Sequence, residues 1–242
     1  EGHRYEWVSA HRGSTLIAHG ATALAVNNGY NAYGGSYLDA NNSHAETTRG
    51  NAYNASVGSA LDAYDADSIG SAGMCFAVSS GSTLQANDTT ADDCGMACYA
   101  ANNNAVINAG NAEALSCGGP GFSAWGNSSI IGGYMTAEEC RDSGFVASQD
   151  SFIHAWNSRA IGNGFDGFSV HSGSFLDANS ADARSDDESN HTIADGNHGV
   201  GLSVSQRSYA SVNGIWARGN HKGGLGGGGS SGIDASWALL LD

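Results

Sequence analysis

Apolar and polar positions alternate along this chain in short bursts, and the bursts recur at a nearly fixed spacing. The starting residues are separated by 22 residues, then by six steps of 23, then by 34 and finally by 23. So many positions kept in register identify a repeat architecture. The ten copies begin at Trp7, Gly29, Ala52, Cys75, Cys98, Gly121, Gly144, Gly167, Gly201 and Gly224.

Each unit contains three bursts of alternation, at places 2 and 4, at places 8, 10 and 12, and near places 15 and 17. A period of two residues predicts strands. The Gly, Asn, Asp and Ser residues between the bursts predict turns. Three short strands in every unit predict an all-β solenoid of about ten coils, with equivalent places stacked along the axis. We expect one domain over residues 1–242, with repeats from about residue 7 to 242.

The inward places predict continuous stacks through the core. Phe168 belongs to an aromatic column and Leu176 to a Leu/Ile column, and stacked aromatic rings stabilise one another beyond their burial. Ser174 belongs to a column in which nine of the ten copies carry serine. A nucleophile would occur once, so this column predicts a hydroxyl ladder that bonds to the backbone or to the next serine.

The five cysteines fall into two of these columns. Neighbouring coils place equivalent residues about one strand spacing apart, which is close enough for a disulfide. Small buried thiols are the favoured interpretation, because the count is odd and the columns are purely stacked. One or two disulfides between coils are the alternative, and zinc-ligand spacing is absent. The first column contains Cys75 and Cys98, and the second contains Cys94, Cys117 and Cys140.

The outward places of the second predicted strand carry the candidate ligand-binding residues. Flat apolar rings beside Asp, Asn and His suit a sugar ligand, and clustered exposed aromatic residues call for an explanation. A subunit interface would bury the same rings, so both interpretations stay open. The candidates on this strand are Phe152, His154, Trp156, Phe175, Asp177 and Tyr209, and Trp125 and His171, which lie just before the strand in their own coils, are added to them.

Two pairs of titratable residues share outward places on adjacent coils, and each offers a minor catalytic hypothesis. Asp39 and Asp62 could act as the two carboxyls of a glycosidase, and His154 and Asp177 could form a His–carboxylate pair. The alternative for the aspartates is solvation or a bound cation. The catalytic residues therefore stay unknown.

An insertion of 11 residues is expected within residues 184–200. Loops on a rigid scaffold often carry function, although a tolerated surface excursion is the simpler interpretation. The candidates in this loop for a cation or ligand are Asp186, Asp187, Glu188, His191, Asp195 and His198.

The charge of the chain excludes some partners. Its formal net charge is −15, with only nine Lys and Arg residues. Nucleic acid requires clustered cations, and an anionic membrane surface is equally unsuitable. No apolar run approaches the ~20 residues that span a bilayer. We expect no nucleic-acid partner, no membrane insertion, no cofactor and no metal site.

The motif G-[FY]-x-A-x-x-G-S-x-[LI]-x-A-x-x-A-x-A, as in Gly167–Ala183, resembles the repeats of bacteriophage tail-fibre and tailspike proteins. More distantly, it resembles the β-helix of polysaccharide lyases and epimerases. This resemblance implies a right-handed parallel β-helix, a homotrimer, and binding or cleavage of host surface polysaccharide. It covers the chain from about Trp7 to Ala235, and it carries over no catalytic motif.

The leading functional hypothesis is therefore a virion fibre or tailspike component that recognises host cell-surface polysaccharide. One alternative is a β-helix polysaccharide lyase or glycoside hydrolase. Another is a secreted or cell-surface adhesin whose regular rod is itself the function. The expected location is the virion or the extracellular space. The scarcity of lysine and arginine weighs against an enzyme.

Overall fold

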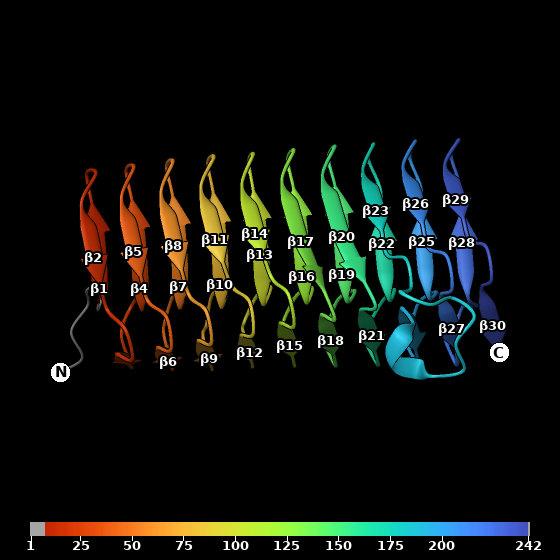
Figure 1. Ribbon diagram of the computed structural model, residues 1–242, viewed down its shortest axis with the longest axis horizontal. Helices are drawn as coiled ribbons and strands as arrows, with labels where there is room; N and C mark the ends of the chain where they lie inside the picture. The colour runs from red at the N-terminus through yellow and green to blue at the C-terminus, as the bar shows by residue number, and fades with distance from the viewer. Residues whose placement is uncertain (1–7, 242) are drawn as a thin grey trace.

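The computed structural model describes residues 8–241 and has the predicted architecture, a right-handed parallel β-helix of ten coils. Each coil gives one strand to each of three ten-stranded parallel sheets. Figure 1 shows the coils in chain order along a straight rod, with the first and last described coils at opposite ends. Trp7, the predicted start of the first unit, lies outside the described residues.

We name the three sheets A, B and C, in the order in which each coil enters them. Sheet A consists of β1 (Val8–His11), β4 (Tyr30–Tyr33), β7 (Tyr53–Ser56), β10 (Phe76–Ser79), β13 (Tyr99–Asn102), β16 (Phe122–Trp125), β19 (Phe145–Ser148), β22 (Phe168–Val170), β25 (Leu202–Val204) and β28 (Leu225–Gly227). Sheet B consists of β2 (Thr15–Ile17), β5 (Tyr37–Asp39), β8 (Ala60–Asp62), β11 (Thr83–Gln85), β14 (Val106–Asn108), β17 (Ser129–Gly133), β20 (Phe152–Trp156), β23 (Phe175–Asp177), β26 (Tyr209–Ser211) and β29 (Gly232–Asp234). Sheet C consists of β3 (Thr22–Leu24), β6 (His44–Glu46), β9 (Asp67–Ile69), β12 (Thr90–Asp92), β15 (Glu113–Leu115), β18 (Thr136–Glu138), β21 (Arg159–Ile161), β24 (Ile193–Asp195), β27 (Trp216–Arg218) and β30 (Leu239–Leu241).

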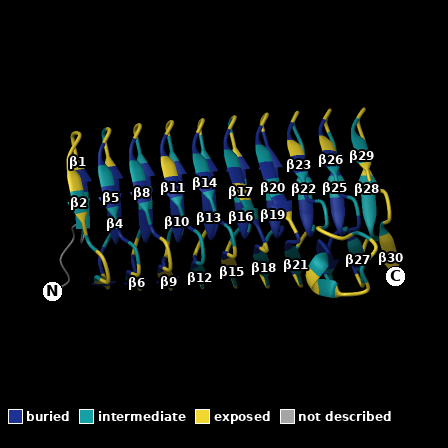
Figure 2. Ribbon diagram, viewed as in Figure 1, coloured by how far each residue is buried: buried dark blue, intermediate teal, exposed yellow. Residues whose placement is uncertain are grey.

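The core is a set of continuous stacks, as the inward columns predict. Seven aromatic rings from Tyr30 to Phe168 stack along sheet A, with neighbouring centroids 4.6–4.9 Å apart and planes within 12° of parallel. Leu176 is buried in the parallel Leu/Ile column. Figure 2 shows the buried strands along the middle of the rod and more exposed residues at the turns and at both ends.

Two of the three tyrosines in this stack, Tyr53 and Tyr99, contact a polar side chain one coil earlier, whereas the Tyr30 hydroxyl donates to the backbone carbonyl of Ala21 at 2.5 Å. The Tyr99 hydroxyl lies 2.9 Å from the Thr89 hydroxyl, and the Tyr53 hydroxyl lies 3.0 Å from that of Ser43. Phe76 in the same stack has alanine, Ala66, at the equivalent position. A buried hydroxyl needs a hydrogen-bond partner, which a side-chain hydroxyl supplies for Tyr53 and Tyr99 and a backbone carbonyl supplies for Tyr30.

The serine column forms the predicted ladder. The hydroxyl of Ser174 accepts a hydrogen bond from the backbone N–H of Ser151 at 3.1 Å, and the Ser174 N–H donates to the Ser208 hydroxyl at 3.1 Å. The same contact links Ser36 to Ser59. Ser174 is therefore a structural residue of the turn between sheets A and B.

A second polar ladder, not predicted from the sequence, runs inside the turn that follows sheet C. The side-chain amide of Asn163 donates to Asn197, and that of Asn197 donates to Asn220, both at 2.9 Å. Asn163 and Asn197 are fully buried. Each also donates to a carbonyl on sheet C, so this buried column is satisfied internally.

The cysteine prediction is wrong for four of the five residues. Cys75 is bonded to Cys94, and Cys98 to Cys117, each pair with its Cα atoms 5.8 Å apart. These disulfides join the two columns within one unit, so the alternative of bonds between stacked copies is also wrong. Only Cys140 is a free buried thiol among the described cysteines. The missed signal was that residues 19 apart in a unit face each other across the turn.

The insertion lies earlier in the chain than expected. Arg159 pairs with Ile193 and Ala160 with Ala194, so regular coil structure has resumed at Ile193. The extra residues therefore lie between β23 and β24 and include a short 3-10 helix, η1 (Glu188–Asn190). Ala183 does not occupy the inward column; Ala194 does, because the pairing register and not the local motif decides the stack.

Candidate functional site

The outward face of sheet B collects most of the candidate binding residues. Along β20 the inward Ile153 and Ala155 are buried, whereas Phe152 and His154 are half-buried and Trp156 is exposed. This alternation follows from the pleat of a strand, which turns successive side chains to opposite faces. Parallel pairing in register then sets equivalent outward residues of neighbouring coils side by side.

Three of the predicted aromatic residues form an exposed ladder on this face. The ring centroids of Phe152 and Phe175 are 5.4 Å apart, and those of Phe175 and Tyr209 are 5.5 Å apart. Their planes are inclined by only 20° and 13°. Phe175 and Tyr209 keep 36% and 41% of their surface exposed. The result is an apolar strip, three rings long, on a rigid sheet.

A polar strip runs beside the aromatic ladder. His154 Nε2 lies 3.5 Å from Asp177 Oδ2, and the side-chain amide of Asn179 donates to Asp177 Oδ1 at 2.5 Å. The predicted pairing of His154 and Asp177 on adjacent coils is therefore present. Both side chains stay about one-third exposed, so their polar atoms are accessible to a ligand.

Trp156 is the last residue of β20, and it packs on the preceding coil. Its ring lies 4.7 Å from that of Tyr134 in an edge-on arrangement. A Cβ atom at Gly133 would lie 2.2 Å from the indole, so only glycine leaves room for the ring. Trp156 therefore has a fixed position at the border of the candidate face.

Trp125 and His171 do not join this group. Trp125 is the last residue of β16 in sheet A and is 42% exposed. His171 follows β22 in the same sheet, and its Nδ1 contacts the Ser172 hydroxyl at 3.2 Å. Both lie just before the sheet B strand of their own coil, as expected, and a tight turn separates them from the aromatic residues on that sheet.

A second polar cluster lies on sheet B near the N-terminal end of the rod. The Tyr37 hydroxyl donates to Asp62 Oδ2 at 2.6 Å, and His19 Nε2 lies 2.6 Å from Asp39 Oδ2. The hydrogen bond to Asp62, assisted by partial burial, raises the pKa of Tyr37 to about 12. Tyr37 is therefore a neutral donor near pH 7. The two aspartates are predicted from the sequence, whereas Tyr37 and His19 are not, because their places vary from coil to coil.

The insertion is fixed to sheet C by an ion pair and by a stacked ring pair. Arg218 donates to both carboxylate oxygens of Glu188, at 2.6 and 3.4 Å, and to Asp195 at 2.8 Å. This contact lowers the pKa of Glu188 and raises that of Arg218. His191 is buried and stacks on Trp216, with ring centroids 4.2 Å apart. These groups therefore act as the anchor of the loop.

The other insertion candidates have local roles or lie in the regular coil. Asp187 accepts a hydrogen bond from the Ser189 backbone N–H at 3.0 Å, which lowers the pKa of Asp187. Asp186 is an exposed residue of the same loop, and His198 belongs to the turn that follows β24.

Within residues 8–241, no group of three or more His, Cys, Asp or Glu residues is arranged to hold a metal ion. No helix in that range has the length and apolar character needed to cross a membrane.

Comparisons with known proteins show a likeness in fold. No sequence model of a known family matches the chain, and no curated protein matches it significantly. A double mutant of the periplasmic alginate epimerase AlgG superposes with a TM-score of 0.61 over 95% of this chain and 71% of that one, at 10% identity. The unmutated AlgG superposes with a TM-score of 0.54 over 93% of this chain and 73% of that one, at 11% identity.

Proposed function

We propose that this protein binds a polysaccharide along the outward face of sheet B. The observation that carries the proposal is the exposed ladder of Phe152, Phe175 and Tyr209, with ring centroids 5.4–5.5 Å apart. Such rings offer the apolar faces of sugars a flat contact. The adjacent His154 and Asp177 offer hydrogen-bonding groups to sugar hydroxyls. The rings cost little conformational entropy on binding, because the sheet already orders them.

The structural neighbours support a polysaccharide ligand at the level of the fold. The protein named in those comparisons is an alginate epimerase, which favours a polysaccharide-active β-helix over the virion fibre that the repeat motif suggested. The homotrimer expected for a virion fibre receives no support from this likeness. The two disulfides are typical of oxidising compartments and fit an extracellular location.

The test is a comparison of two phenylalanine variants. Phe175 lies in the ladder, and Phe165 is a 58% exposed phenylalanine in the turn between sheets C and A. Phe175→Ala should raise the Kd for a bound oligosaccharide about tenfold, which corresponds to ~1.4 kcal/mol. Phe165→Ala should leave the Kd unchanged. Equal Kd values for wild type and both variants would contradict the proposal.

A second candidate function is chemical modification of the same polysaccharide. It is favoured by the cluster in which Tyr37 contacts Asp62 and His19 contacts Asp39. Paired carboxyl groups can supply the acid and base of glycoside cleavage, at separations of ~5–9.5 Å. Tyr37→Phe should abolish product release from a polysaccharide, whereas Tyr33→Phe on sheet A should not. Unchanged turnover by Tyr37→Phe would exclude this cluster.

A further inference from the structure

We infer that the polysaccharide bound by sheet B is uncharged, and is neither a polyuronate nor a sulfated glycan. This inference rests on the proposed function and specifies its ligand class. It is carried by the distribution of charged side chains over the three sheets. A ligand with one anion per sugar needs cations along its binding face, in the way that phosphate backbones do.

The outward face of sheet B has carboxylates and amides where a polyanion would need cations. None of the ten strands of sheet B, as bounded in the structure, contains a lysine or an arginine. Gln85 and Asn108 bond to each other across neighbouring strands at 3.0 Å in the middle of this face. The outward carboxylates on these strands are Asp39, Asp62, Asp177 and Asp234.

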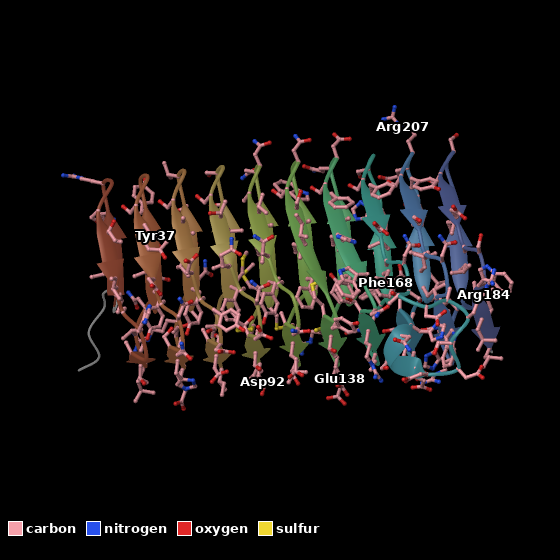
Figure 3. All side chains as sticks on the ribbon, in the orientation of Figure 1. Tyr37, Asp92, Glu138, Phe168, Arg184 and Arg207 are labelled. Atoms are coloured by element: carbon pink, nitrogen blue, oxygen red, sulfur yellow. A yellow bond between two sulfur atoms is a disulfide. The ribbon has the colours of Figure 1, made fainter. Side chains whose placement is uncertain are left out.

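The cations of the described chain lie elsewhere. Arg159 and Arg218 belong to sheet C, where Arg218 is neutralised by Glu188 and Asp195. Arg207 is the cation nearest to the aromatic ladder in sequence, in the turn just before Tyr209. Asp150 lines the same shallow hollow as Arg207. Figure 3 shows Arg207 projecting from the turn at the top edge of the rod.

The groups that sheet B does offer suit hydroxyl-rich, uncharged sugars. Carboxylates accept hydrogen bonds from hydroxyls, and side-chain amides both accept and donate them. A polyuronate would instead bring its carboxylates toward those of the face, and like charges at an interface disfavour binding. The net charge of −15 adds a long-range repulsion. Alginate is a polyuronate, so the inferred ligand differs in class from the polysaccharide named for the structural neighbours.

The test titrates the native protein with oligosaccharides of equal length. The uncharged probes are cello-, N-acetylchito- and manno-oligosaccharides, and the anionic probes are oligomannuronate and oligogalacturonate. We expect at least one uncharged probe to bind ten times more tightly than either anionic probe. Tighter binding of an anionic probe would overturn the inference and leave the proposed function standing. Binding of none of the five would overturn the proposed function and the inference with it.

A matched pair of variants tests whether the face, and not the net charge, sets this preference. Thr83 on β11 and Thr90 on β12 belong to the same coil, and both point outward, one from sheet B and the other from sheet C. Thr83→Lys and Thr90→Lys change the net charge equally. Thr83→Lys should increase the affinity for oligomannuronate several-fold at low salt, and the gain should shrink at high salt. An equal gain from Thr90→Lys, or no gain from Thr83→Lys, would contradict the inference.

Discussion

His154 on β20 and Asp177 on β23 lie directly opposite each other, with Nε2 and Oδ2 3.5 Å apart. Phe152 and Phe175, two residues earlier on the same strands, form a stacked pair. A polar pair and an aromatic pair therefore lie side by side on one face. The in-register pairing of neighbouring coils creates this arrangement, because it repeats each outward place one strand spacing away.

This arrangement predicts that His154 and Asp177 contribute jointly to ligand binding. His154→Ala and Asp177→Asn should each weaken binding, and the double variant should lose less than the sum of the two single effects. The reason is that residues in contact act non-additively. Calorimetric titration of the four proteins measures the coupling. Asp92→Asn, an equivalent change on sheet C (labelled in Figure 3), is the control. Strict additivity would contradict a joint role.

The match between Tyr99 and Thr89 predicts a pattern of stabilities. Thr89→Ala removes a hydroxyl 2.9 Å from that of Tyr99 and should cost about 0.5–1.5 kcal/mol of unfolding free energy. Adding Tyr99→Phe should recover most of that loss, because the double variant copies the combination of Phe76 and Ala66 one coil away. Denaturant midpoints of the three variants and wild type measure this. A double variant less stable than Thr89→Ala would contradict the match.

The disulfide assignment predicts the number of thiols that react with an alkylating reagent. The folded protein should resist labelling at pH 8, because burial raises the pKa of the Cys140 thiol to about 11 and shields the sulfur. The protein unfolded without reductant should gain one label, and the reduced protein five. Mass spectrometry counts the labels. Three or five labels before reduction would show that one or both disulfides are absent.

The contact between Glu188 and Arg218 predicts a pH-dependent anchor for the insertion. The arginine lowers the pKa of Glu188 below its usual value of 4.5. Because the folded-state pKa is depressed, the contact stabilises the loop above pH 4.5 and is lost as the pH falls through the folded-state value. Hydrogen exchange in residues 178–192 should therefore be slow at pH 7 and faster, after correction for intrinsic rates, near pH 3. In Glu188→Gln the exchange should be faster already at pH 7. A wild-type loop equally protected at both pH values would contradict this role.

The repeat pattern predicted the fold because each column of the coil has one physical requirement. Inward places must hold apolar or small residues because they are buried. The turn between sheets A and B needs a side-chain hydroxyl, such as that of Ser174, to accept a backbone hydrogen bond. The same logic drew attention to the outward face of sheet B, because its outward places vary from coil to coil whereas the inward places do not. Columns alone therefore locate the core and the unusual surface.

Contacts between different columns could not be predicted in the same way. The bond between Cys75 and Cys94 joins two columns and depends on how the turn after sheet C folds back. The ladder from Asn163 to Asn220 runs within one column, but the repeat alone did not show that this column points into the turn. The insertion was predicted too late in the chain because Ala183 is a small residue at the spacing expected for the inward column of sheet C. Only the pairing of Ala160 with Ala194 shows which residue of the coil occupies that column.

The most direct measurement of the central claim is a crystal structure of the protein with the oligosaccharide that binds most tightly. The account predicts sugar rings against Phe152, Phe175 and Tyr209, with hydroxyls bonded to His154 or Asp177. A sugar bound on another face would contradict it. So would a second copy of the chain covering these rings, together with a matching dimer or trimer mass in solution.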